Sequence, residues 1–305
     1  MARPLVIISA FIAAMVANAP IRAQDPGTLN PVPLPPLSNP KDPATPAKEL
    51  FGRALEPAPM TARSIGGYAR GCLAGAVPLP INGQTWQVMR LSRDRNWGHP
   101  NLIRFLERLA NKVPTVAGWP GLLVGDMSQP RGGPMLTGHA SHQIGLDADI
   151  WLTPMPTREL TVEEREMMSA TDVVDADHND IDPKVWTPQH GAVIRAAAED
   201  HAVERIFVNP AIKKALCREA GNERGWLEKV RPWFGHNYHF HVRIHCPADD
   251  PDCHGQPPPT GGDGCGSELS SWFVKQAHPP KPGPPPRPLR MADLPPACHQ
   301  VLIAR

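Results

Sequence analysis

The chain has 305 residues, of which 31 are lysine or arginine and 30 are aspartate or glutamate, giving a formal net charge of +1. A near-neutral charge argues against a nucleic-acid partner, which would favour a basic face. The length is sufficient to bury one sizeable hydrophobic core.

The N-terminus has the pattern of a secretory signal. Residues 1–23 carry Arg3, an apolar run from Leu5 to Val16, and a small residue, Ala23, at the expected cleavage point. We expect an exported chain with its signal peptide cleaved after Ala23, and an uncleaved anchor is the alternative. Because the apolar run is too short to span a bilayer comfortably, no membrane span is expected.

Composition divides the remainder into three parts. Residues 24–60 are rich in proline and polar residues, which predicts an extended lead-in. Residues 61–255 are expected to form one compact domain. Residues 256–305 are a tail dense in proline and glycine, with a short apolar interlude from Trp272 to Val274.

Three helices are predicted within the compact domain. Apolar residues recur at helical spacing over 100–112, as in an amphipathic helix. Thr187-Pro188 and Asn209-Pro210 each place a capping residue before a proline. These pairs predict the starts of two further helices, which run to about residues 200 and 219.

Two segments have the alternation of strands that are apolar on one face only. In the segment 146–152, the polar face should carry Asp147 and Asp149 with Trp151. In the segment 237–245, one face should carry His239, His241, Arg243 and His245, and the other Tyr238, Phe240, Val242 and Ile244. The elements together predict an α+β fold, with a small, mainly antiparallel sheet, helices packed to one side and the polar groups on the exposed face.

If these two strands pair, Asp149 and His241 converge, and His142, on the turn before the first strand, closes a third side. Two imidazoles and one carboxylate, with a fourth position left open, are the ligand set of a catalytic zinc ion. The alternative is a solvated sheet face that happens to carry histidines. The three residues are therefore candidate zinc ligands.

Four stretches of the sequence match a known family in the same order. They are RLSRDRNWGHP (90–100), DMSQPRGGPMLTGHASHQIGLDADIW (126–151), ERIFVNPAIKKALC (204–217) and RPWFGHNYHFHVRIHCP (231–247). The chain resembles the penicillin-insensitive murein endopeptidases, zinc peptidases of the superfamily that holds lysostaphin-type enzymes and D-Ala-D-Ala dipeptidases. The resemblance covers most of residues 60–255.

The resemblance implies the same zinc ligands, His142, Asp149 and His241. It makes His239 the catalytic base, and places His139 and His236 in the same site, either as an oxyanion-stabilising group or, for His139, as a further metal ligand. The implied function is a periplasmic zinc endopeptidase that ignores β-lactams. Its implied substrate is the murein peptide crosslink, cut between D-alanine and meso-diaminopimelic acid.

The resemblance also implies a second zinc ion, held by Asp175 and His178 in an acidic loop that ends at Asp182. The alternatives are a solvated acidic loop or a loose calcium site. Gln129 and Arg131, in the glycine-bearing loop before the ligand turn, are candidate contacts of the peptide substrate.

Six cysteines, an even number in a chain expected to be exported, predict three disulfides. Their spacing does not determine the pairing. The family resemblance implies Cys72 with Cys298, Cys217 with Cys265, and Cys246 with Cys253.

Two other functions compete with a crosslink endopeptidase. One is a zinc D,D-carboxypeptidase that trims uncrosslinked stem peptides, and the other is a non-catalytic, metal-containing module that binds the cell wall. Retention of His239 beside a complete ligand set favours catalysis. The sequence carries no indication of the oligomeric state.

Overall fold

A computed structural model describes residues 25–259, 262–279, 281 and 283–305. The predicted signal peptide, residues 1–23, lies outside the described residues. Among the residues described, no helix combines the length and the apolar character that crossing a membrane requires.

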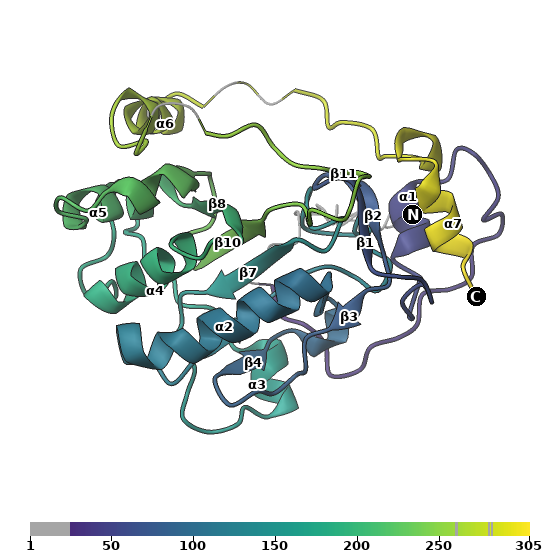
Figure 1. The fold of residues 1–305 in the computed structure, drawn as a ribbon, viewed down its shortest axis with the longest axis horizontal. Coiled ribbons are helices and arrows are strands. Elements are labelled where there is room, and N and C mark those ends of the chain that lie inside the picture. The colour runs from purple at the N-terminus through teal and green to yellow at the C-terminus, as the bar shows by residue number, and fades with distance from the viewer. Residues whose placement is uncertain (1–24, 260–261, 280, 282) are drawn as a thin grey trace, which may run out of the picture.

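A six-stranded sheet organises the molecule, in the order β4-β6-β7-β10-β8-β9 (Figure 1). Its strands are β4 (Trp86–Val88), β6 (Leu122–Val124), β7 (Asp147–Trp151), β10 (His239–Ile244), β8 (Val203–Val208) and β9 (Val230–Pro232). The three inner pairings are antiparallel, and only the two edge pairings are parallel. The predicted α+β class with a mainly antiparallel sheet is confirmed.

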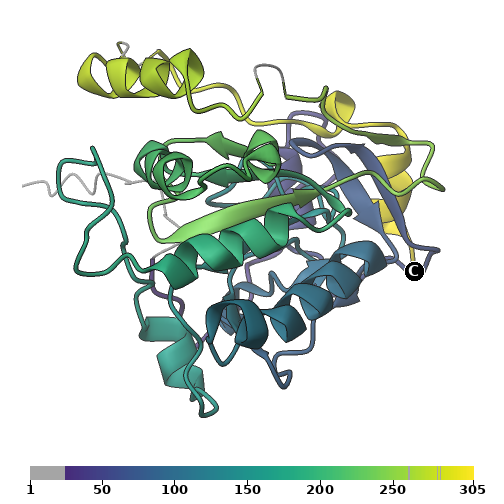
Figure 2. The ribbon, with the colours of Figure 1, turned by 60° about the vertical axis from the view of Figure 1, so that its left-hand side comes forward.

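Three helices cover one face of this sheet (Figures 1 and 2): α2 (Pro100–Ala117), α4 (Pro188–Ala198) and α5 (Pro210–Glu219). Their apolar sides share one core with Ala148 and Ile150 of β7 and with Phe240 and Val242 of β10. Both predicted cap positions are confirmed, and the Asn209 side chain accepts a hydrogen bond from the Ala211 N–H at 2.9 Å. Helix α2 is longer than expected and ends only before Gly118, whose φ of 67° is one that glycine adopts readily.

The opposite sheet face is covered by loops and by a smaller apolar cluster that includes Met89, Trp151 and Tyr238. Tyr238 was expected beside Phe240 on the helix side. It instead precedes β10, which begins at His239, so the alternation of the strand does not apply to it. His245 likewise follows the strand and is exposed. Because this face is covered, the side chains of β7 and β10 are buried on both faces.

A second layer joins the two ends of the described chain. It contains the three-stranded sheet β11-β1-β2, with β1 (Arg63–Gly67), β2 (Arg70–Ala74) and β11 (Cys253–His254), and the helices α1 (Ala47–Phe51) and α7 (Ala297–Ile303). The remaining elements are β3 (Val77–Pro78), β5 (Trp97–Gly98), α3 (Val162–Met167), α6 (Ser267–Ala277) and the short 3-10 helices η1 (Leu91–Arg93), η2 (Gly225–Lys229) and η3 (Met291–Asp293).

All three disulfides that the family resemblance implied are present. Cys72–Cys298 ties α7 to β2, and Cys217–Cys265 ties the start of α6 to α5. Cys246–Cys253 closes the short loop between β10 and β11. The tail beyond residue 255 is thereby fixed to the compact domain at two points.

Candidate metal centre

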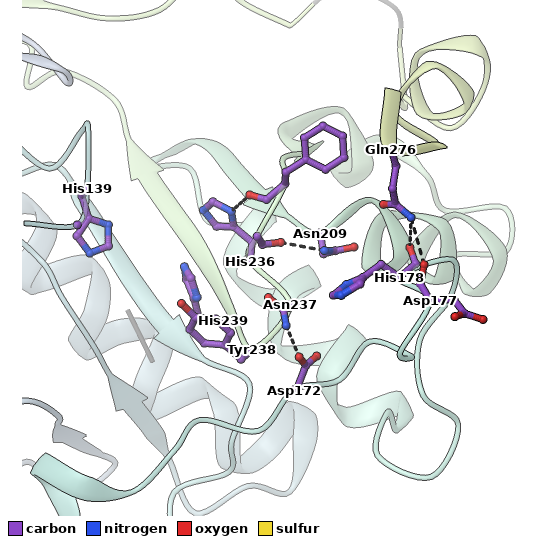
Figure 3. Close-up of a pocket in the computed structure, with 13 residues that line it drawn as sticks. His139, Asp172, Asp177, His178, Asn209, His236, Asn237, Tyr238, His239 and Gln276 are labelled. Carbon is purple, nitrogen blue, oxygen red and sulfur yellow. Dashed lines mark hydrogen bonds between the residues drawn. The ribbon is translucent and has the colours of Figure 1, made fainter. Parts of the chain in front are cut away.

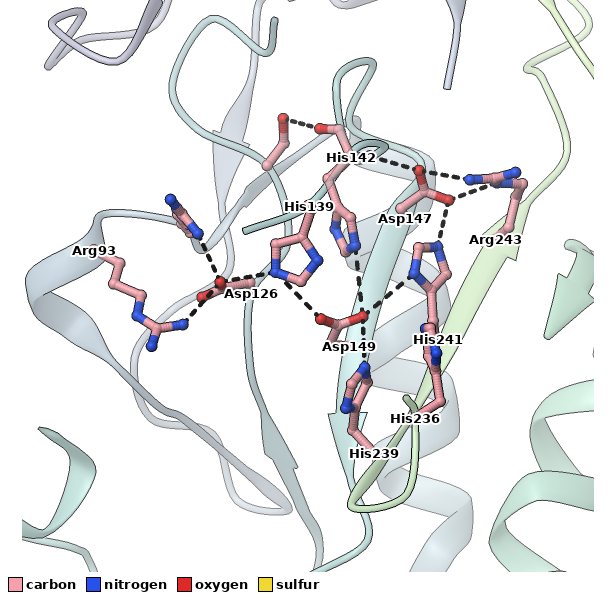
Figure 4. Close-up of polar contacts among 12 residues, drawn as sticks. Arg93, Asp126, His139, His142, Asp147, Asp149, His236, His239, His241 and Arg243 are labelled. Carbon is pink, nitrogen blue, oxygen red and sulfur yellow. Dashed lines mark hydrogen bonds and ion pairs between the residues drawn. The ribbon is translucent and has the colours of Figure 1, made fainter. Parts of the chain in front are cut away.

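Asp149 lies at the centre of a cluster of imidazoles on the sheet face opposite the helices (Figure 4). It is paired directly with His241 in the β7–β10 register. Its Oδ1 atom is 3.4 Å from His241 Nδ1, 3.5 Å from His142 Nε2 and 3.6 Å from His239 Nε2. Its Oδ2 atom is 3.5 Å from His139 Nε2. The structure therefore brings together residues from β7, from β10 and from the turn that precedes β7.

These separations are of the size found between neighbouring ligands of one metal ion. With metal–ligand bonds of about 2.1 Å, neighbouring ligand atoms in a tetrahedron are roughly 3.4 Å apart. The separations from Asp149 are close to that value. The ligand atoms of His139, His142 and Asp149 also lie within 4.8 Å of one another.

The polar atoms of the cluster are buried without hydrogen-bond partners. This holds for both ring nitrogens of His142, both carboxylate oxygens of Asp149 and Nδ1 of His239. Buried polar groups nearly always have a partner, because an unpaired one costs about 1–3 kcal/mol. A divalent cation would take lone pairs from the Asp149 carboxylate and from the His142 nitrogen that faces it, so the residues present fit a metal ion.

The ionisation of Asp149, His239 and His241 suits a metal, whereas Asp149 raises the pKa of His142 against the effect of burial. Burial lowers the pKa of His239 to about 3 and that of His241 to about 4, against the opposing effect of nearby aspartates. Burial alone would raise the pKa of Asp149, yet the imidazoles of His239, His139 and His142 hold it well below its usual range. At neutral pH, His239 and His241 are therefore neutral with free lone pairs, and Asp149 is an anion.

Asp147 fixes the orientation of His241. Its Oδ1 atom accepts hydrogen bonds from His241 Nε2 at 3.0 Å and from Arg243 Nε at 2.7 Å. Although Asp147 is fully buried, the charge of Arg243 and the hydrogen bond from His241 keep its pKa below the usual range. With Nε2 engaged, His241 presents Nδ1 to the centre, which is the arrangement of a carboxylate–histidine–metal triad.

A second buried carboxylate, Asp126, holds His139 on the other side. Its Oδ2 atom lies 3.0 Å from His139 Nε2, 3.0 Å from Arg93 Nη1 and 2.9 Å from Arg95 Nη1. Sequence reasoning did not find this group. The available signal was an acidic residue two positions after the apolar strand β6, on the segment that leads to the histidine turn.

A cavity of about 750 Å³ opens beside the cluster (Figure 3). His139, His236 and His239 all line it. The rings of His236 and His239 have centroids 4.8 Å apart. Helix α6 contributes Gln276, whose amide donates to the backbone carbonyls of the 177–178 loop. The tail therefore forms one wall of the cavity.

The other candidate site residues do not belong to the imidazole cluster around Asp149. Asp175 accepts hydrogen bonds from the backbone N–H groups of Asn179 and Asp180 and so closes its own loop. His178 lines the cavity, and within the described residues neither belongs to a close group of three potential ligands. Gln129 and Arg131 donate to backbone carbonyls of their own loop, of residue 56 and of α7. Their role in the structure is to hold these segments together.

Comparison with known proteins supports the family resemblance seen in the sequence. The family model for penicillin-insensitive murein endopeptidase matches residues 64–303. A protein of that name from Haemophilus influenzae is 52% identical over 222 residues, covering 73% of this chain and 76% of that protein. Proteins of the same name from Citrobacter koseri and Klebsiella pneumoniae subsp. pneumoniae are each 46% identical, over 267 and 260 residues, covering 85% of this chain and 91% of theirs. A match of this extent, which includes every residue of the imidazole cluster, places the chain in the penicillin-insensitive murein endopeptidase family.

Proposed function

We propose that this chain is an exported zinc endopeptidase that hydrolyses murein peptide crosslinks between D-alanine and meso-diaminopimelic acid, and that it acts in the periplasm. The observation that carries the proposal is the buried Asp149 carboxylate, which lies 3.4 to 3.6 Å from four imidazoles, close enough for some of them to share a metal ion with it. The names of the relatives supply the murein substrate. The three disulfides agree with an oxidising compartment.

We assign the zinc ligands as His142, Asp149 and His241. His139 stands apart from this set because its Nε2 atom already contacts Asp126 at 3.0 Å. When bound, zinc would supply Lewis-acid activation of water and of the peptide carbonyl. A second ion at Asp175 and His178 remains a prediction that metal analysis would test.

The cavity residues divide the remaining tasks. His239 is neutral at neutral pH and its Nε2 atom faces the centre, 3.6 Å from Asp149 Oδ1, so it can accept a proton during hydrolysis and return it to the leaving amine. His139 and His236 line the same cavity and can donate hydrogen bonds to the oxygen that becomes negative. Among the described residues that line the cavity there is no serine, the nucleophile that β-lactams acylate in penicillin-binding proteins.

An assay with isolated muropeptides tests the proposal. We expect the purified chain to convert crosslinked dimers to monomers, to lose this activity with a chelator and to keep it with penicillin. Release of D-alanine from monomers, with dimers left intact, would indicate the carboxypeptidase instead. Binding to murein without any cleavage, in protein shown to contain zinc, would indicate the non-catalytic module.

A further inference from the structure

The sheet face that carries the metal centre continues over two further strands. Asp149 on β7 pairs with His241 on β10, which pairs with Phe207 on β8, which in turn pairs with Arg231 on β9. Residues in register on neighbouring strands project to the same face. At about 4.8 Å per strand, Arg231 lies roughly 14 Å along this row from Asp149. The face beyond His241 is therefore within reach of a substrate bound at the centre.

A second cavity, of about 760 Å³, lies over this part of the face. Its floor includes Phe207 and Arg231, and its walls come from the tail, at residues 257–259 and at Trp272 of α6. Helix α6 thus lines both cavities, with Gln276 in the first and Trp272 in the second. The two cavities are neighbours on one side of the molecule.

Three aromatic rings, two of them exposed, line the two cavities, with Phe234 in the first and Trp233 and Trp272 in the second. We define Trp233, Phe234 and Trp272 as the aromatic platform. The ring centroids of Trp233 and Trp272 are 5.8 Å apart, and those of Phe234 and Trp272 are 4.9 Å apart. Trp233 is 53% exposed and Phe234 is 42% exposed, and within the described chain they are the only aromatic residues among the exposed large hydrophobic side chains. An exposed apolar surface beside a cleft is characteristic of a binding site.

We propose that the aromatic platform binds the amino-sugar rings of the murein glycan strand, an inference that rests on the proposed function. A sugar ring presents C–H groups on its faces, which pack against aromatic rings, and polar groups on its edge. The Phe207 ring connects the centre with the platform, because its centroid lies 5.3 Å from that of His241 and 5.7 Å from that of Trp233. About three extended residues span such a path, which is the order of length of the stem peptide that joins the crosslink to the glycan. A crosslink bound at Asp149 would therefore place the sugar at Trp233.

The charges in the second cavity favour this neutral ligand over a carboxylate. Arg231 already bonds to the Glu268 carboxylate at 2.6 Å and to the Gly262 carbonyl at 3.1 Å. Arg205 donates to the Pro257 carbonyl at 2.8 Å. The Nε atoms of both arginines lack a partner but are buried, so the surface that the cavity offers to a ligand consists chiefly of aromatic and proline rings.

The test compares two crosslinked substrates, a muropeptide dimer that carries its disaccharides and the same peptide dimer without sugars. For the native chain we expect kcat/KM to be about tenfold higher with the sugars. Trp233→Ala should bring the ratio of the two values close to one, and Trp233→Phe should restore most of it. The control is Met167→Ala, an exposed residue of α3, which should leave the ratio as in the native chain.

A native ratio near one would overturn the proposal. So would a Trp233→Ala variant in which both kcat/KM values fall in proportion, because that pattern indicates a structural role. If the native chain cleaves neither dimer, the proposed function fails, and the platform is then tested by the binding of peptide-free glycan strands in calorimetry. Binding that Trp233→Ala weakens supports the platform, and absence of binding refutes it.

Discussion

The Asp147 carboxylate accepts a hydrogen bond from the backbone N–H of His142 at 2.9 Å. His142 has a φ of 67°, in the left-handed region that is costly for a residue with a Cβ. The other oxygen of Asp147 accepts from His241 Nε2. One buried carboxylate thus stabilises the strained turn that presents the first proposed ligand and orients the ring of the last.

We therefore expect Asp147→Asn to weaken zinc binding about 10- to 100-fold. Asparagine has one acceptor oxygen in place of two, so it cannot hold the His142 backbone and the His241 ring in the same way. Competition with a chelator of known affinity measures the change. The control is Asp200→Asn, which removes a carboxylate that pairs with Arg108 at the surface. Zinc affinity equal to that of the native chain would show that Asp147 does not position the ligands.

The proposed roles of the cluster predict two classes of variant. His142→Ala, Asp149→Ala and His241→Ala should each lose bound zinc and activity. His239→Ala should keep zinc and lose turnover, because His239 is assigned to proton transfer. Metal analysis and dimer cleavage, measured on the same preparations, separate the two classes. A fully active His239→Ala variant would rule out its assignment as the base.

Local patterns were sufficient to predict the two strands that carry the proposed ligands Asp149 and His241. A period of two places His239 and His241 on one side of β10, and the same rule places Asp149 on the polar side of β7. The helix starts at Pro188 and Pro210 were also predictable, because a capping residue acts on the backbone within one helical turn. The rule failed for Tyr238, because alternation holds only within the strand, and the strand begins one residue later.

Features that depend on distant segments were not predictable from such patterns. The contact between Asp126 and His139 depends on the path of the loop that joins them and on two arginines that precede α2. Gln276 reaches the 177–178 loop from 98 residues away. The disulfide pairing was obtained only from the family resemblance, because spacing alone permits many pairings. Packing, rather than local propensity, determines these contacts.

The three disulfides should differ in how much they stabilise the fold. Loop-closure entropy predicts losses of about 5, 4 and 2 kcal/mol when the bonds that span 226, 48 and 7 residues are replaced by serine pairs. Denaturant unfolding of the three double variants measures the order. The variant without Cys246–Cys253 is the internal control, because it loses a disulfide but opens only a short loop. If it were the least stable of the three, loop closure would not be the main contribution of these bonds.

Lys213 should make stability depend on pH. Its side chain is fully buried on α5, where Nζ donates to the carbonyls of Leu227 at 2.8 Å and Asp263 at 2.6 Å. Burial, assisted by the nearby charge of Arg231, lowers its pKa from 10.5 to about 7. The unfolded chain therefore binds a proton more tightly than the folded chain, so the free energy of unfolding should rise between pH 7 and about pH 10.5.

In the variant Lys213→Met, the increase in the free energy of unfolding over the same pH interval should be smaller by a few kcal/mol, because methionine has no proton to release. Chemical unfolding at pH 7 and pH 10 gives the slope for each protein. Lys214→Met is the matched control, since its ammonium lies at the surface beside Asp180 and its loss removes no buried charge. An equal slope in native and Lys213→Met protein would mean that folding does not lower the pKa of Lys213. The two carbonyl contacts of its ammonium group would then compensate for the cost of burial.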